Sequence, residues 1–257
     1  QGKKQLAYLQ ERRISPKMIK HFGLGAAPDD WHALENHLKE KGFHRDELVA
    51  ANLLRFSDKN GKRYYFDAFR NKVMYPVIDV RGNVVAFGGR VLDNSKPKYI
   101  NTSDTLVYKK SNELFALNFA KNGNDRKLIL CEGYMDVIAI NQAGIENVVA
   151  TLGTALTSEQ ARLIKQYADE VVISYDSDEA GQKACEKAIE TLSAVGLKIK
   201  VLSLKDAKDP DEYIKKNGKE AFLRLADNAV PAAEFRLRLA RRDHDLSTDT
   251  GVLEYIE

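Results

Sequence analysis

Four short apolar strands alternate with helices in the second half of the chain, and this alternation limits the possible folds more than any other feature. The strands are expected at residues 128–131, 148–150, 171–174 and 199–204, with helices between them at residues 134–143, 158–168 and 179–194. Strands joined by helices of this length form right-handed βαβ crossovers, which place the strands parallel in one sheet. We therefore expect an α/β protein with a parallel sheet and flanking helices.

Carboxylates follow three of these strands. Glu132 comes after the first strand, Asp176 and Asp178 come after the third, and Asp206, Asp209 and Asp211 come after the fourth. Ligands of an open parallel sheet bind beyond the carboxyl ends of its strands, so these acids should gather at one edge. Such a cluster repels itself unless protons or cations balance it, and oxygen donors without His or Cys nearby favour Mg²⁺ or Mn²⁺. The pattern predicts a metal site at this edge.

Two alternative explanations of these acids stay open: helix capping and a receiver domain of a signalling protein. A single acid after a strand often caps the next helix, as Asp178 could for the helix at residues 179–194. Receiver domains of signalling proteins also carry acids at strand ends. They need a lysine after a later strand, however, and no basic domain stands in front of them.

The first half of the chain has a different pattern. Residues 1–54 are expected to be helical, with a helix start at Ser15-Pro16 and with Trp31 packed on the inner face of a helix at residues 29–41. Alternating apolar residues at 73–77 and 84–86 flank Arg81-Gly82-Asn83, which predicts a β-hairpin. Another helix is expected at residues 111–121.

The charge is divided unevenly along the chain. Residues 1–110 carry 21 Lys and Arg against 12 Asp and Glu, whereas residues 111–233 carry 15 against 19. In the basic half, cations are interleaved with Tyr64, Tyr65, Tyr75, Tyr99 and Tyr108. This combination suits a nucleic-acid or nucleotide-phosphate surface. The alternative is an ordinary solvated surface whose tyrosines pack in the core.

The sequence supports neither a membrane-spanning protein nor a small protein held together by disulfides. No stretch approaches the roughly 18 apolar residues of a membrane helix. Cys131 and Cys185 form no CxxC or Cys/His pattern, so neither a zinc finger nor a disulfide framework is expected. The chain begins at Gln1 rather than Met, and we expect it to be an excised fragment.

A series of motifs in one order resembles bacterial DNA primases of the DnaG type. The basic motifs are Phe69-Arg70-Asn71-Lys72-Val73-Met74-Tyr75-Pro76, Phe87-Gly88-Gly89-Arg90-Val91-Leu92 and Pro97-Lys98-Tyr99-Ile100-Asn101. The acidic motifs, similar to those of a Toprim domain and its primase extension, are Cys131-Glu132-Gly133-Tyr134-Met135-Asp136, Tyr175-Asp176-Ser177-Asp178-Glu179-Ala180-Gly181 and Asp209-Pro210-Asp211-Glu212. Gly153-Thr154-Ala155-Leu156-Thr157 resembles a further Toprim loop. Arg13 departs from the pattern, because the family usually has glycine there.

The resemblance implies three subdomains and a set of site residues. It implies a basic α/β subdomain for template and nucleotide binding at residues 1–121, a Toprim subdomain for metal binding and catalysis at 122–212, and the start of a helical subdomain at 213–257. The implied catalytic residues are Glu132, Asp176 and Asp178, and the implied metal ligands are these three with Asp209 and Asp211. The residues expected to contact nucleotide or DNA are Arg12, Arg70, Lys72, Arg90, Lys98, Tyr99, Asn101, Lys109 and Asp136.

The function expected from the residues and the resemblance together is primer synthesis. The chain would join ribonucleoside triphosphates on single-stranded DNA by two-metal nucleotidyl transfer with Mg²⁺ or Mn²⁺. Zinc is expected only in a separate domain absent from this fragment, and the replicative helicase would bind through a region that is also absent. The expected setting is the cytoplasmic replisome. The alternatives are a Toprim nuclease or topoisomerase-like enzyme that cleaves DNA, and a non-catalytic DNA-binding recombination module.

Overall fold

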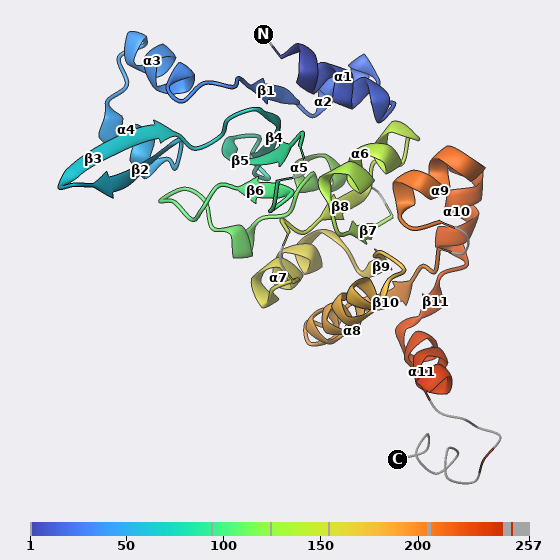
Figure 1. The fold of residues 1–257 in the computed structure, drawn as a ribbon. Helices are drawn as coiled ribbons and strands as arrows, with labels where there is room; N and C mark the ends of the chain where they lie inside the picture. The colour runs from blue at the N-terminus through green and yellow to red at the C-terminus, as the bar shows by residue number, and fades with distance from the viewer. Residues whose placement is uncertain are drawn as a thin grey trace.

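The computed structural model describes residues 2–93, 95–123, 125–153, 155–204 and 207–243 together with Thr248. Thr154, which belongs to one of the motifs above, and Asp206, one of the acids after the fourth predicted strand, lie outside the described residues. Figure 1 shows a chain that runs from an N-terminal part of helices and antiparallel strands, through a central sheet, to helices at the C-terminal end. No helix in the described ranges is long and apolar enough to cross a membrane.

The central sheet has five strands in the order β11-β10-β9-β7-β8. Its parallel strands are β7 (Lys127–Cys131), β8 (Val148–Ala150), β9 (Glu170–Ser174) and β10 (Lys198–Val201), and β11 (Val230–Pro231) pairs antiparallel with β10 at the edge. The predicted parallel sheet is confirmed. Strand β10 is shorter than expected, because only Leu202 N–H still bonds to the Ile173 carbonyl before the chain leaves the sheet.

Both faces of this sheet are covered, as expected for continuous apolar strands. Ile129 and Cys131 of β7 point into a core shared with α6 (Tyr134–Gln142), whereas Leu128 and Leu130 point into a core shared with α7 (Ser158–Tyr167) and α8 (Glu179–Ser193). Successive strand residues face opposite sides. The packing on both faces therefore fixes the carboxyl ends of the strands, where the acidic residues follow.

The N-terminal part contains an antiparallel sheet in the order β1-β4-β5-β6. Its strands are β1 (Gly25–Ala27), β4 (Lys72–Ile78), β5 (Val84–Val91) and β6 (Tyr99–Asn101). Two helices, α1 (Lys3–Glu11) and α2 (Pro16–His21), precede β1 in the chain and lie next to it in Figure 1. The predicted β4–β5 hairpin is confirmed, and the Ser15 hydroxyl accepts a hydrogen bond from Met18 N–H at the predicted start of α2. Arg13 adopts the left-handed φ of 61°, which explains why a glycine suits that position.

Three features of the first half differ from the sequence prediction. The first is β1, a strand paired with β4 at residues 25–27, where the sequence predicted helix. A two-stranded hairpin, β2 (Leu54–Lys59) and β3 (Lys62–Asp67), follows α3 (Ala33–Glu40) and α4 (Arg45–Ala50) and lies far from the central sheet (Figure 1). Trp31 precedes α3 and is 56% exposed, so its assignment to the core is wrong. One face of its ring is covered by the Arg70 guanidinium instead of by apolar side chains.

The helix expected at residues 111–121 is also wrong. Only a 3₁₀ turn, η1 (Lys110–Asn112), and the short α5 (Leu117–Ala120) form there. Phe115 exchanges backbone hydrogen bonds with Ala150 of β8, and Leu114 and Phe115 are buried. Long-range pairing thus replaces the local helix.

Helices follow the last parallel strand, as predicted. They are α9 (Pro210–Asn217), α10 (Lys219–Asp227) and α11 (Ala232–Asp243). Helix α9 lies close to α6, so the acids at its start are brought to the edge of the sheet where Glu132 stands.

Candidate active site

Glu132 and Asp176 meet at the carboxyl ends of β7 and β9. One carboxylate oxygen of Glu132, Oε1, accepts a hydrogen bond of 3.0 Å from the backbone N–H of Asp176. Gly181, in the first turn of α8, makes this approach possible. A Cβ atom at Gly181 would lie 2.2 Å from the Asp176 carbonyl oxygen and 3.0 Å from Glu132 Oε1. The glycine of the acidic motif is therefore required by space alone.

Asp178 and Asp209 cap helices. Asp178 accepts a hydrogen bond of 2.8 Å from Gly181 N–H at the start of α8, and Asp209 accepts one of 2.8 Å from Glu212 N–H at the start of α9. The capping alternative raised by the sequence is thus correct for both residues. Each of these bonds uses the Oδ1 atom of the carboxylate, and Oδ2 accepts no hydrogen bond from the residues that the structure describes, so it could bind a ligand.

Burial and mutual repulsion shift the pKa values of the central acids upward. The pKa of Asp136 rises to about 8 because its carboxyl group is buried and because Asp209, Asp176, Asp211 and Glu132 surround it with negative charge. The pKa of Asp176 rises to about 6 through burial and through the charges of Glu132, Asp209 and Asp178. Burial also raises the pKa of Glu132. The acids therefore act as one electrostatic cluster.

Asp211 completes this cluster from the first turn of α9. Its Oδ2 atom lies 2.7 Å from Lys215 Nζ and 3.9 Å from an Arg12 guanidinium nitrogen. Its Oδ1 atom is buried and has no hydrogen-bond partner among the described residues. An unpaired buried carboxylate oxygen costs free energy, and a cation beside it would remove that cost.

The chemistry of these donors fits a divalent cation of the Mg²⁺ type. All five predicted ligands are carboxylates, which such ions prefer. Within the described part of the chain, however, no three His, Cys, Asp or Glu side chains converge on a ready-made metal position. The carboxylates stand close enough to perturb one another, but an ion would have to draw them together.

Arginines and tyrosines lie beside the acids. The Arg90 guanidinium stands 4.7 Å from the ring centroid of Tyr8 and 5.3 Å from that of Tyr99, and it donates a hydrogen bond of 2.9 Å to the Tyr99 hydroxyl. The pKa of Arg12 is raised, since Tyr8, Asp211 and Tyr99 outweigh the effect of burial. Arg12, which follows α1, thus approaches Asp211 of α9. Arg90 of β5 is joined to the cluster through Tyr99, whose pKa is raised by burial and, among other charges, by that of Asp136.

A second set of contacts joins the N-terminal sheet to the acidic motif. The Tyr134 hydroxyl donates a hydrogen bond of 2.7 Å to Asn101 Oδ1, and Asn101 Nδ2 donates one of 2.6 Å to the Leu152 carbonyl. The Tyr134 ring also stacks on Tyr75 at 4.9 Å. A Cβ atom at Gly88 would lie 2.5 Å from the Tyr134 hydroxyl oxygen, so this glycine admits the ring. Both ends of the Asn101 amide are already used within the protein.

The remaining predicted binding residues lie outside this cluster. Lys98 and Lys109 are exposed, and Lys72 donates a hydrogen bond of 3.2 Å to the Arg70 carbonyl. Burial and the charges of Arg70 and Arg55 lower the pKa of Lys72. Arg70 and Lys72 therefore belong to a second basic region, near Trp31.

Three residues of the cluster were not predicted. Tyr8 precedes Arg12 by one helical turn, and that spacing could have indicated it. Tyr134 stands within one of the acidic motifs. Lys215 follows Asp211 at the i,i+4 spacing of a helical ion pair, which was also available in the sequence.

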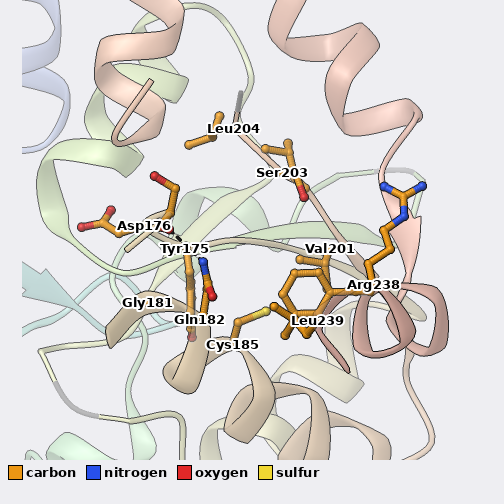
Figure 2. A pocket seen from close by; sticks show the side chains of 13 residues that line it. Tyr175, Asp176, Gly181, Gln182, Cys185, Val201, Ser203, Leu204, Arg238 and Leu239 are labelled. Atoms are coloured by element: carbon orange, nitrogen blue, oxygen red, sulfur yellow. Dashed lines mark hydrogen bonds between the residues drawn. The ribbon is translucent and has the colours of Figure 1, made fainter. Parts of the chain in front are cut away.

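A cavity of about 290 Å³ adjoins the cluster. Figure 2 shows Asp176 at one end of it and Arg238 at the other, with Cys185 and Leu239 on its lower wall. The thiols of Cys185 and Cys131 are buried and free, and burial raises the pKa of both.

Comparisons with known proteins agree with this architecture. Residues 1–121 match the family described as DNA primase catalytic core, N-terminal domain, and residues 129–214 match the Toprim-like family. The DNA primase of Clostridium acetobutylicum is 47% identical over 251 residues, which are 97% of this chain and 41% of that protein. The DNA primase of Haemophilus influenzae is 39% identical over 249 residues, covering 95% of this chain and 42% of that protein.

Solved structures show the same relationship. A DNA primase domain from Pseudomonas aeruginosa superposes with a TM-score of 0.86 at 36% identity, covering 98% of this chain and 80% of that one. A DnaG primase catalytic domain bound to ssDNA gives a TM-score of 0.84 at 35% identity, covering 99% of this chain and 83% of that one.

The fold and site together define a Toprim-like protein with a basic antiparallel sheet in front of its acidic cluster. More narrowly, the chain belongs to the family of DnaG-type DNA primase catalytic cores. It spans about two fifths of the length of the curated relatives described above.

Proposed function

We propose that this chain synthesises RNA primers, joining ribonucleoside triphosphates on a single-stranded DNA template and releasing pyrophosphate. The observation that carries the proposal is the cluster of partly buried, mutually repelling carboxylates, with Arg12 beside Asp211 and Arg90 bonded to the neighbouring Tyr99. Phosphoryl transfer needs cations at the reacting phosphates and positive side chains along the triphosphate, and this arrangement offers places for both. Its relatives bear the name DNA primase, and one related structure is described as bound to ssDNA.

The proposal divides the chain into three parts. Residues 1–121 would bind template and nucleotide, residues 122–212 would hold metal and perform catalysis, and residues 213–257 would begin a helical subdomain. The uneven charge supports this division, since the basic residues concentrate before residue 111.

Five carboxylates are the proposed metal ligands: Glu132, Asp176, Asp178, Asp209 and Asp211. Two Mg²⁺ or Mn²⁺ ions held there would lower the pKa of the primer 3′-hydroxyl and stabilise charge on the departing pyrophosphate. Glu132 would act either as a ligand at the primer end or as the base that accepts the hydroxyl proton. Burial raises its pKa, and the hydrogen bond from Asp176 N–H holds its orientation.

The positive and neutral groups have separate proposed roles. Arg12, Arg90 and Lys98 would contact phosphate oxygens, and Tyr99 orients Arg90 through its hydroxyl. Asp136, whose pKa is raised to about 8 in the metal-free protein by burial and by the neighbouring acids, would contact nucleotide through its carboxyl group. The other proposed DNA or nucleotide contacts are Arg70, Lys72, Asn101 and Lys109.

The proposed partners and setting follow from primer synthesis. They are the DNA template, ribonucleoside triphosphates and the replicative helicase, in the cytoplasmic replisome.

One gel separates this function from its rivals. The 257-residue chain is incubated with Mn²⁺, labelled single-stranded DNA and differently labelled ribonucleoside triphosphates. New short RNA with intact DNA is the expected result. Shortened DNA without RNA would indicate a nuclease or topoisomerase-like enzyme instead. DNA binding without either product, indifferent to Asp176→Asn, would indicate a non-catalytic module.

A further inference from the structure

The cavity beside Asp176 has an apolar body. It lies between the first turns of α8, the chain that follows β10, and α11 (Figure 2). Its wall is made mainly of apolar side chains: Cys185, Val201, Leu202, Leu204, Phe235 and Leu239. A dry cavity of about 150 Å³ holds a benzene molecule. This cavity, at about 290 Å³, therefore has room for a ring system of the size of a purine.

The two ends of this cavity carry opposite charges. Figure 2 shows Asp176 at one end and Arg238 at the other. The charges give a bound molecule a direction, because an anionic group is repelled by Asp176 and attracted by Arg238. At the Asp176 end, the carboxylate can accept a hydrogen bond from an amino group on a ring. The cavity therefore suits a ring that carries an amino group on one side and an anion on the other.

A second hollow continues the site beyond Arg238. Its volume is about 440 Å³, and it shares Val201, Ser203 and Arg238 with the apolar cavity. Its polar lining residues are Ser203, Tyr213, Lys216, Asn217, Asn228 and Arg238. Among the described residues that line it there is no Asp or Glu. Two cations and two hydroxyl groups without an acid suit a phosphate group.

Arg238 can serve such a ligand while it keeps its own ion pair. One guanidinium nitrogen, Nη2, pairs with Glu234, one turn earlier on α11, and the Arg238 side chain stays 57% exposed. An exposed pair of this kind contributes little free energy, and a guanidinium has five N–H donors. Arg236, on the same helix, pairs with Glu190 of α8 instead. The two arginines thus have different surroundings, although they stand two residues apart.

We propose that the apolar cavity and the adjoining hollow together bind a nucleoside monophosphate. The base lies in the apolar cavity with an amino group toward Asp176, and the phosphate lies beside Arg238 and Lys216. Inorganic phosphate would leave the apolar cavity empty, and an uncharged nucleoside would leave the cations without a ligand. The site is separate from the proposed triphosphate contacts at Arg12 and Arg90, which belong to the N-terminal part of the chain.

The consequence for primer synthesis rests on the proposed function, whereas the binding does not. Asp176 lines the cavity and is also a proposed metal ligand. A bound base that takes up the Asp176 carboxylate therefore competes with the metal ion. Nucleoside monophosphates accumulate when triphosphates are consumed, so the site would slow primer synthesis when its substrate is scarce.

Equilibrium dialysis of radiolabelled AMP against the 257-residue chain tests the binding, in chelator and without triphosphate. AMP should bind saturably. Arg238→Ala should weaken binding about ten-fold, which corresponds to about 1.4 kcal/mol from one charge-assisted hydrogen bond. Cys185→Phe fills the apolar cavity and should abolish binding, whereas Cys185→Ala should bind as the wild type does. Adenosine and inorganic phosphate should each compete about ten-fold less well than AMP.

Arg236→Ala is the matched control, since it removes a cation from the same helix, and it should leave the affinity for AMP unchanged. Arg90→Ala should also leave this affinity unchanged, because Arg90 lies outside the proposed site. Three results would overturn the proposal: no saturable binding by the wild type, equal losses in Arg236→Ala and Arg238→Ala, or a loss in Arg90→Ala with Arg238→Ala unaffected.

A further competitor separates two sources of the same chemistry. An oligo(dA) strand with a 5′-phosphate displaces AMP if the site takes the end of a strand, and leaves AMP bound if the site takes free nucleotide. Either result keeps the site. Because dialysis measures no synthesis, a chain that makes no primers can still bind AMP here. Primer synthesis without AMP binding would remove this site alone.

Discussion

Replacing Asp136 by Asn should stabilise the metal-free protein, by an amount that grows with pH. The Asp136 carboxyl group is buried among four other acids, and its pKa is about 8 in the folded protein against a usual value of 3.8. The folded protein therefore keeps a proton that the unfolded chain releases. The contribution of the protonated Asp136 to the free energy of unfolding is fully present below a pH of about 4, and it is lost as the pH rises toward about 8.

The magnitude follows from the separation of the two pKa values. At pH 7 the Asp136 carboxyl group is still mostly protonated in the folded protein, whereas in the unfolded chain the pH lies about three units above its pKa of 3.8. Loss of this proton therefore favours unfolding by about 4 kcal/mol. Asn has the shape of a protonated Asp and does not titrate. Asp136→Asn should therefore gain stability up to this amount at pH 7 and almost none at pH 4.

Urea unfolding of both proteins in chelator, at several pH values between 4 and 8, measures the difference directly. The two free energies of unfolding should converge at the acidic end and separate steadily above it. A variant that is less stable at pH 7, or a difference that stays constant with pH, would show that Asp136 is not held protonated by its acidic neighbours. Adding Mg²⁺ should reduce the difference, because the ion stabilises the wild-type carboxylates.

Three further predictions concern space, catalysis and nucleotide binding. Gly88→Ala places a Cβ atom 2.5 Å from the Tyr134 hydroxyl and should cost about 1–3 kcal/mol in urea unfolding, whereas Gly25→Ala, with 3.8 Å to Met74 Cβ, should cost less. Asp178→Asn should abolish primer synthesis on a gel while leaving oligo(dT) affinity unchanged or raised; full activity would remove Asp178 from the site. Lys98→Ala should weaken nucleoside triphosphate binding in calorimetry, and an unaltered affinity would argue against its role.

The parallel sheet could be predicted because its signals are local. Leu128–Cys131 and Val171–Ser174 are short apolar runs before clear helices, and apolar strands between helices have few other arrangements. The position of Glu132 and Asp176 at one edge followed from that topology. The edge itself is a consequence of parallel strands, so no knowledge of side-chain contacts was needed.

Features that depend on distant residues could not be predicted. Leu114 and Phe115 lie in a segment whose local sequence predicts a helix, but the backbone pairing of Phe115 with Ala150 holds them in an extended conformation. Arg12 reaches Asp211 from the opposite end of the chain, and no periodicity indicates that contact. Trp31 has the spacing of a core residue, yet Arg70 covers its ring in place of the core. The β2–β3 hairpin was missed although Asn60-Gly61 is a strong turn signal, because its strands are mostly polar.

Binding of Mn²⁺ to the wild-type chain and to Asp176→Asn, followed by electron paramagnetic resonance of the free ion, decides whether the acidic cluster is a metal site. The carboxylates that follow β7 and β9 and those at the start of α9 stand close enough to raise one another's pKa values, and they are proposed to bind divalent cations. The wild type should therefore bind Mn²⁺ saturably, and binding should strengthen as the pH rises through about 6, where Asp176 ionises. Asp176→Asn should bind Mn²⁺ much more weakly. Equal binding by the two proteins, or wild-type binding that does not change with pH, would contradict a metal role for the cluster.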